Sequence, residues 1–232
     1  MIDRSLNYGR NHIRRFLEQS MPYDRVLDVG AGHGDDLMLA RAVNPKARLF
    51  AVEAHRPFVQ NLVDNGIAVS VLDLERDRLP FDDGGCDVVI ANQVLEHTKD
   101  IFWIFHEVSR VLRVGGKIII GVPNLASLHN RILLLLGKQP SPIKSCSAHV
   151  RGFSRGDICM FLEKCFRGGY ELEKFGGANF YPFPPMLARP LARLVPSMAW
   201  GIFLLLEKSR DYEGSFLEFP VKEKLETKFF LG

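Results

Sequence analysis

The chain has 232 residues, a formal net charge of +3, and 47% hydrophobic and 25% charged residues. This length suits one domain with a sizeable core, and the composition excludes a disordered chain. Proteins that bind nucleic acids usually carry a concentrated basic face, which a charge this small does not indicate. We therefore expect no nucleic-acid partner.

The N-terminal segment, the longest apolar runs and the cysteines indicate where the protein works. The N-terminal residues lack the apolar segment of a secretion signal, and the longest apolar runs are far shorter than the roughly 18 residues of a membrane span. None of the four cysteines form a CxxC pair, which is typical of a reducing compartment. No metal is expected, because no standard zinc ligand spacing matches the set Cys146, His149, Cys159 and Cys165. We expect a cytoplasmic protein, with peripheral membrane contact and oligomeric state left open.

Short apolar runs alternate with helical periodicity in the first half, which indicates βαβ units and a parallel sheet. An N-terminal helix would place Ile13, Phe16 and Leu17 on one face. Strands are predicted at residues 26–29, 48–53, 68–72 and 87–91. Asp100 suits the N-cap of a helix that continues to residue 112. The glycine pair at 115–116 should stop this helix before a fifth strand at 117–122.

The second half is less regular. Residues 124–152 are predicted to be an insertion with a short apolar helix at 128–136. Ser154 suits the N-cap of a helix to residue 166, followed by a strand at 170–175. A proline-rich stretch, 181–196, precedes a last strand at 200–207. The predicted α/β domain covers residues 26–209, with acceptor-side insertions at 123–153 and 176–198. It lies between an N-terminal helical segment (1–25) and a tail (210–232).

The sharpest local signal is a glycine-rich turn directly after the first strand. Gly30, Gly32 and Gly34 alternate there, and Asp28 precedes them. Three glycines let the backbone turn tightly and let a ligand approach bare N–H groups, whereas an ordinary turn needs one. The spacing is GxGxG, which differs from the GxGxxG of dinucleotide sites. A buried-strand aspartate also suits a ligand that carries an ammonium group.

Polar residues follow the next three strands. Glu53 ends the second strand, where a carboxylate can accept both hydroxyls of a ribose in either class of nucleotide site. Asp73 and Leu74 follow the third strand, where they suit an exocyclic amine and a base face or merely form a loop. Asn92 follows the fourth, at the edge where open α/β sheets bind ligands. Glu96 and His97 come soon after, either as site residues or as solvent-exposed helix-start polarity.

Five strings in this order resemble the motifs of class I methyltransferases that use S-adenosylmethionine (SAM). They are VLDVGAGHGD, AVEA, LDLE, FDDGGCDVVIANQVLEH and EVSRVLRVGGKIIIGVPN, between residues 26 and 124. The resemblance is closest to the type 11 methyltransferase domain of the ubiquinone- and menaquinone-biosynthesis-like group. It implies a Rossmann-like sheet of seven mostly parallel strands, helices on both faces and a small lid. Its last strand would lie antiparallel between the fifth and sixth.

The resemblance also implies roles for particular residues. Asp28, Gly30, Gly32 and Gly34 would hold the methionine part of SAM, Glu53 the ribose, and Asp73 and Leu74 the adenine. Asn92 would line the edge near the methionine moiety. The acceptor site of this group is built from the N-terminal segment and the insertions after the fourth, fifth and sixth strands.

Two features of that acceptor region carry hypotheses. His149 lies in an H-x-R-x-F-S string, where it either takes a proton from an attacking hydroxyl or orders its loop beside Arg151. The stretch 181–196 carries Arg189 and Arg193 four residues apart, and forms either a lid for a lipid-like acceptor or a helix packed on the sheet edge. We expect methyl transfer to a small-molecule, lipid or saccharide acceptor, preferably at oxygen. A non-catalytic SAM-binding protein and an NAD(P)-dependent oxidoreductase are the alternatives.

Overall fold

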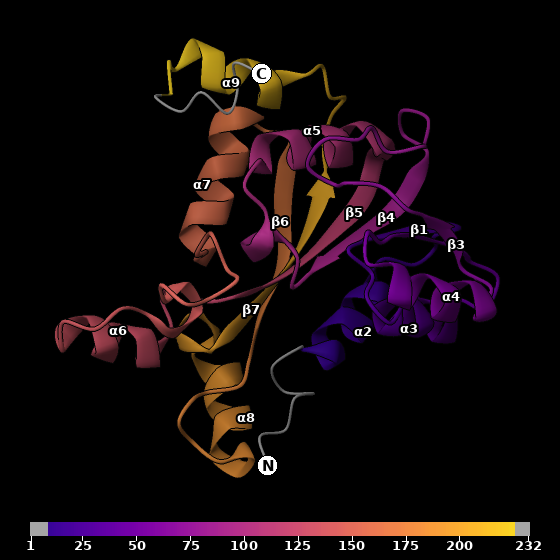
Figure 1. The fold of residues 1–232 in the computed structure, drawn as a ribbon. Coiled ribbons are helices and arrows are strands. Elements are labelled where there is room, and N and C mark those ends of the chain that lie inside the picture. Colours follow the sequence, from indigo (N-terminus) through magenta and orange to yellow (C-terminus); the bar gives the residue numbers. More distant parts are fainter. Residues whose placement is uncertain (1–8, 226–232) are drawn as a thin grey trace.

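The computed structural model describes residues 9–225, and these contain a seven-stranded sheet (Figure 1). The strand order is β3-β2-β1-β4-β5-β7-β6, with β7 antiparallel to both of its neighbours and the other strand pairs parallel. The strands are β1 (Arg25–Val29), β2 (Arg48–Val52), β3 (Ala68–Ser70), β4 (Cys86–Asn92), β5 (Leu112–Pro123), β6 (Tyr170–Ala178) and β7 (Gly201–Lys208). The predicted fold class is confirmed, including the antiparallel last strand between the fifth and sixth.

Helices cover both faces of this sheet. One face packs against α2 (Arg10–Gln19), α3 (Asp35–Val43) and α4 (Arg56–Asp64), and the other against α5 (Ile101–Val111), α7 (Arg155–Cys165) and α9 (Ser215–Lys222). Successive strand side chains point to opposite faces, so β4 contributes Val88 and Ile90 to the first core and Val89 to the second. A strand buried on both faces has to be apolar throughout, which explains the run of valine and isoleucine in β4.

The expected helix starts are confirmed, and the strand ends differ by a few residues. The side chain of Asp100 accepts from Trp103 N at 3.0 Å, and the side chain of Ser154 accepts from Asp157 N. The fifth strand starts at Leu112, earlier than predicted. Its register against β4 shifts between Cys86 and Val88, and the glycine pair lies in the resulting irregularity. Glycines accommodate such a bulge within a strand, which is why they do not separate the helix from the strand here.

Three short helices lie in the segments that were predicted as insertions and as a tail. The helix α6 (Leu128–Leu135) occupies the first insertion and α8 (Pro185–Leu194) the second, and both project away from the sheet (Figure 1). The helix α9 lies in the segment expected as a tail, and its Phe216 is fully buried between α5 and α7. Parts of the predicted N-terminal segment (residues 1–8) and tail (residues 226–232) lie outside the residues that the structure describes. Within the described part, none of the helices is long and apolar enough to cross a membrane.

The strand order reverses between β1 and β4, so the connections that follow these two strands lead to opposite sides of the sheet. From β1 the chain moves outward to β2 and β3, and then returns to β4 and β5 on the opposite side. Open α/β sheets bind ligands at such a reversal. The glycine-rich turn follows β1 and Asn92 ends β4, so both lie at the carboxyl edge where the order reverses.

Candidate functional site

The glycine-rich turn has a backbone conformation in which two of the three glycines leave no room for a side chain. Gly30, Gly32 and Gly34 all have positive φ, at 83°, 54° and 82°. A Cβ on Gly30 would lie 2.7 Å from Val94 Cγ2, and one on Gly34 would lie 2.5 Å from Leu62 Cδ2. Around Gly32, no heavy atom of the described residues lies within 4 Å of such a position. The turn therefore packs on the protein at both ends and leaves its middle open to a ligand.

Glu53 is fixed beside this opening. One carboxylate oxygen accepts from Gly32 N at 2.7 Å and the other from His55 N at 2.7 Å. The side chain follows β2, whose carbonyl at Val52 accepts from Gly30 N at 2.8 Å. A carboxylate has about four acceptor positions, so both oxygens retain capacity for further hydroxyl donors. This arrangement fits a ribose diol next to the glycine turn.

Three buried carboxyl groups surround the opening. Asp28 near the end of β1, Asp36 in the first turn of α3 and Glu53 are all buried. Burial raises the pKa of Asp28 well above its ordinary value, and the nearby charges of Asp36 and Glu53 raise it further. Burial also raises the pKa of Asp36. A cation held among these groups would stabilise their ionised forms, whereas a pyrophosphate would be repelled. The residues therefore fit the ammonium and sulfonium charges of SAM better than a dinucleotide.

The remaining predicted cofactor-binding residues lie after β3 and at the end of β4. Asp73 lies on an exposed turn, where its side chain accepts from Glu75 N at 3.0 Å, and Leu74 is half-buried against the core. Asn92 ends β4, and its Nδ2 donates to Asp36 Oδ2 at 2.7 Å. The structure therefore joins Asn92 to the carboxyl cluster. The adenine role of Asp73 and Leu74 stays a prediction.

His149 lies next to Glu96 and His97, which we call the EHH cluster. Glu96 and His97 lie in the short 3-10 helix η1 (Leu95–His97) just after β4. The rings of His97 and His149 have their centroids 4.6 Å apart at 81°. Burial lowers the pKa of His149, and the neighbouring His97 lowers it further. Whether His149 acts as a free base stays a prediction.

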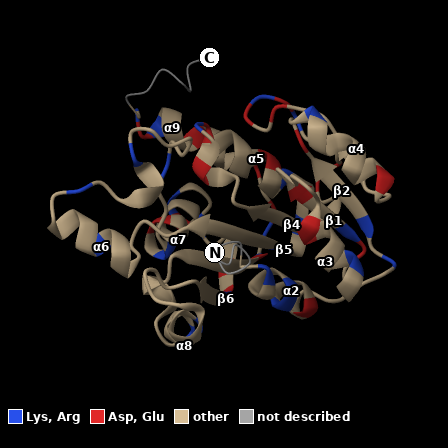
Figure 2. Cartoon of the chain, turned by 60° about the horizontal axis from the view of Figure 1, so that its bottom comes forward, with Lys and Arg blue, Asp and Glu red and all other residues tan. Residues whose placement is uncertain are grey.

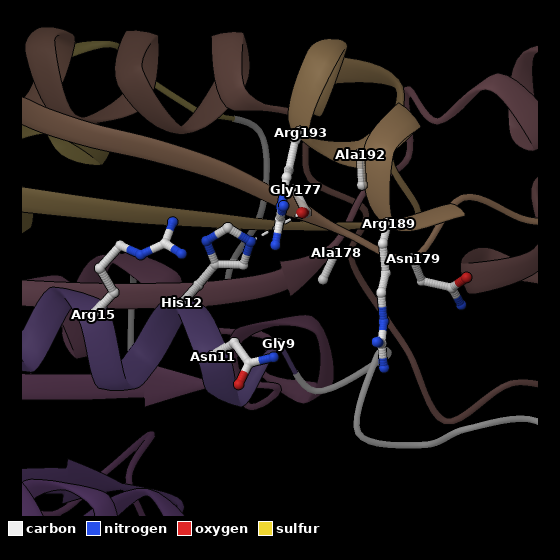
Figure 3. A pocket seen from close by; sticks show the side chains of 10 residues that line it. All are labelled: Gly9, Asn11, His12, Arg15, Gly177, Ala178, Asn179, Arg189, Ala192 and Arg193. Carbon is white, nitrogen blue, oxygen red and sulfur yellow. Dashed lines mark hydrogen bonds between the residues drawn. The ribbon is translucent and has the colours of Figure 1, made fainter. Parts of the chain in front are cut away.

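A separate cationic cavity of about 170 Å³ lies where α2 and α8 meet the end of β6 (Figure 3). Arg15, Arg189 and Arg193 line it together with His12, whose Nε2 lies 2.9 Å from Gly177 O. Burial lowers the pKa of His12, and the charges of Arg15 and Arg193 lower it further. Among the described residues that line the cavity there is no carboxyl group, so its charge favours an anion.

Sequence reasoning overlooked several of these residues. Asp36 is the second of two acidic residues at the start of α3, and its link to Asn92 depends on β1 and β4 being neighbours. Gln93 has a φ of 56°, which is uncommon outside glycine and often found at functional sites. Arg15 lies in an arginine-rich helix with no motif to distinguish it. Only the fold brings it close to Arg193.

Comparison with known proteins agrees with this geometry. Residues 27–120 match the family model described as a methyltransferase domain. A 27-O-demethylrifamycin SV methyltransferase of Amycolatopsis mediterranei is 29% identical over 115 residues, which are 45% of this chain and 42% of that protein. A probable tRNA methyltransferase 9B of Mus musculus is 33% identical over 113 residues, 47% of this chain and 24% of that one. The chain thus spans less than half the length of these curated relatives.

A solved structure supports the fold over nearly the whole chain. The complex of the Haloferax volcanii Trm112 methyltransferase activator with a methyltransferase gives a TM-score of 0.61, at 17% identity, over 90% of this chain and 95% of the other. Because relatives include a protein named for tRNA methylation, the expected exclusion of nucleic acid is not supported. The glycine turn, the carboxyl cluster and the matched domain agree on one cofactor, SAM, and residues 27–120 resemble the methyltransferase domain of enzymes that use it.

Proposed function

We propose that the protein transfers a methyl group from SAM to a hydroxyl oxygen of an anionic, lipid-like acceptor. The observation that carries the methyl-transfer part is the set of buried carboxyl groups around an open glycine turn. When bound, SAM supplies a methyl group on a positively charged sulfur, and this methyl passes to the acceptor as its bond to sulfur breaks. Such a displacement needs alignment and removal of the hydroxyl proton, so no catalytic triad is required.

In this proposal, residues at the ends of four strands bind different parts of the cofactor. Asp28 and the glycine turn hold the methionine part, and Asn92 adjoins them through Asp36. Glu53 accepts from the ribose, and Asp73 with Leu74 contacts the adenine. The EHH cluster lies further along the same edge, where it would face the acceptor's hydroxyl group.

The cationic cavity supports an anionic acceptor. Arg189 and Arg193 lie one turn apart on α8, and like charges at that spacing destabilise an isolated helix by a few tenths of a kcal/mol. Neither Arg15 nor Arg193 forms an ion pair with another residue between 9 and 225. Guanidinium groups gathered in this way bind phosphate or carboxylate oxygens.

Exposed apolar side chains support a lipid-like acceptor. Ala188 and Ala192 pack α8 on the body of the protein, whereas Met186 (88%), Leu187 and Leu194 remain exposed. On α6, Leu135 is 86% exposed, with Leu134 and Leu136 beside it. In Figure 2 most of α6 has the colour of uncharged residues, and Arg131 is the one charged residue of this helix. Apolar protrusions of this kind suit contact with a membrane surface or a lipid tail.

The four free cysteines support a cytoplasmic location.

The test measures where labelled methyl groups go. The full chain is incubated with methyl-labelled SAM and four hydroxyl acceptors: an anionic lipid in vesicles, a neutral lipid, a water-soluble anion and unmodified tRNA. We expect label in the anionic lipid. Replacing Arg15 and Arg193 by Gln should raise its KM roughly 10–100-fold, because charge-assisted hydrogen bonds contribute about 1.5–3 kcal/mol.

Arg14→Gln is the matched control, because this neighbouring arginine is exposed and pairs with Glu18. Its KM should stay at the wild-type value. Label only in tRNA would replace the lipid acceptor by a nucleic acid. Tight SAM binding with no transfer to any acceptor class would favour a non-catalytic SAM-binding protein.

A further inference from the structure

The EHH cluster brings three metal-binding side chains together from two separate segments. Glu96, His97 and His149 each offer one ligand atom, and these atoms all lie within 4.8 Å of one another. Two hydrogen bonds tie the loop that carries His149 to the segment after β4. Val150 N donates to Glu96 O at 2.8 Å, and Arg151 Nη2 donates to Lys99 O at 2.9 Å. The three groups are therefore positioned by the fold, as a preformed site requires.

Glu96 lacks the partners that a buried carboxylate needs. It is 1% exposed, and neither of its side-chain oxygens has a hydrogen-bond partner among residues 9–225. No lysine or arginine of that part of the chain forms an ion pair with it. Nδ1 of His149 is likewise buried without a hydrogen-bond partner. Leaving a charge in this state is costly by several kcal/mol, so the group requires a proton or a cation.

We propose that Glu96, His97 and His149 bind one first-row divalent metal ion of the Zn²⁺ or Mn²⁺ type. Two imidazoles and one carboxylate are a ligand set for such ions, whereas Mg²⁺ and Ca²⁺ prefer oxygen ligands alone. Three protein ligands leave open coordination positions for a further oxygen. The proposal departs from the expectation of no metal and from a free base at His149.

The site adjoins the cofactor turn. Val94, two residues before Glu96, packs against Gly30, so η1 starts beside the glycine-rich turn. This catalytic part rests on the proposed function. A metal ion at the cluster holds the acceptor's hydroxyl oxygen and lowers its pKa. The hydroxyl proton passes to solvent, the O–CH₃ bond forms, and the bond from that methyl to the sulfur of SAM breaks.

Metal binding is measured on the full chain without an affinity tag, after chelation and dialysis. Cys146 is an exposed free thiol near the site, so Cys146→Ser serves as the background for every variant. Zn²⁺ is titrated by calorimetry, and Co²⁺ is followed by its visible absorption, which reports nitrogen and oxygen coordination. We expect one ion per chain and a higher Tm with Zn²⁺ than without it.

Variants assign the ion to the cluster. His97→Ala and His149→Ala should each weaken Zn²⁺ binding by at least the 10–100-fold that loss of an outer-shell partner causes. Glu96→Gln keeps the shape, removes the charge and should weaken binding as well. The control is His129→Ala, a part-buried histidine on α6 that contacts Ser141 and not the cluster. It should bind Zn²⁺ as the background protein does.

Either of two results overturns the metal site: no stoichiometric binding of either ion, or binding that Glu96→Gln and both histidine variants leave unchanged. Circular dichroism checks that each variant is folded. If a histidine variant is unfolded, the Zn²⁺ affinity of Glu96→Gln decides the question. SAM is titrated into the same chelated samples. SAM binding without metal binding contradicts the metal site and leaves the proposed function standing. Metal binding without SAM binding contradicts the proposed function and leaves the metal site standing.

Discussion

Glu53 tests the ribose assignment at the scale of one residue. Glu53→Ala removes the carboxylate that accepts from Gly32 N and His55 N, and with it two acceptors for the ribose. Charge-assisted hydrogen bonds contribute about 1.5–3 kcal/mol, so SAM affinity should fall roughly 10–100-fold. Calorimetry measures this. Asp35→Asn is the control, because Asp35 begins α3 beside the turn but points to solvent and pairs with Arg10. A folded Glu53→Ala that binds SAM normally would remove this residue from the site.

Asp28 tests the electrostatic account. Burial and the charges of Asp36 and Glu53 raise the pKa of Asp28 above the ordinary 3.8. Below that value the folded and unfolded chains are both protonated. As pH rises from 3.8 toward the raised pKa, the unfolded chain ionises while the folded carboxyl group keeps its proton, so stability is lost. Asp28→Asn should therefore be more stable than wild type at neutral pH, by about 1.4 kcal/mol for each unit of the shift, and the difference should shrink toward pH 3.

The same variant should bind SAM poorly, because the ammonium group loses its carboxylate. Denaturant unfolding between pH 3 and 7 and SAM calorimetry check the two halves on one sample. An Asp28→Asn protein that is less stable at every pH would contradict the account of a carboxyl group held against its own burial. Stability gained without loss of SAM affinity would instead place the cofactor elsewhere.

Among the elements, α9 shows where sequence patterns end. Its eight residues include Pro220 and have no strong periodicity, so nothing marked them as part of the domain. The structure buries Phe216 completely in the core beneath α5 and α7. Removing such a side chain costs about 3–5 kcal/mol, so Phe216→Ala should lower the free energy of unfolding by that amount. Leu217→Ala, at the next and partly exposed position, should cost much less. Equal effects in urea unfolding would mean that α9 does not belong to the core.

Strong periodicity and turn chemistry made most other elements predictable. The caps at Asp100 and Ser154 use a side chain within three residues of the backbone group that it satisfies, so both are visible in sequence. The end of β3 and the start of β5 depend on register against neighbouring strands, which sequence does not contain. In α8, Ala188, Ala192 and part of Leu191 pack inward, as the prediction of a packed helix expects. Met186, Leu187 and Leu194 are exposed, and the lid for a lipid-like acceptor stays a prediction.

For the whole molecule, the glycine turn and the residues after β2 and β4 could be found from motifs, because each lies next to its own strand. On the proposed acceptor side, the sequence indicated His97, His149 and Arg193 singly. It did not indicate which residues lie together: Arg15 of α2 with Arg193 of α8, and His97 of η1 with His149 of a distant loop. These pairs come from segments far apart in the sequence, so they became visible only in the fold.

The central claim is that the sheet edge at the carboxyl ends of β1 and β4 binds SAM and not a dinucleotide. Calorimetry of the full chain with SAM, with its demethylated product and with NADH tests it most directly. The account predicts micromolar binding of SAM, about −8 kcal/mol, and no measurable binding of NADH, whose pyrophosphate would face Asp28, Asp36 and Glu53. Binding of NADH in the absence of SAM binding would contradict it.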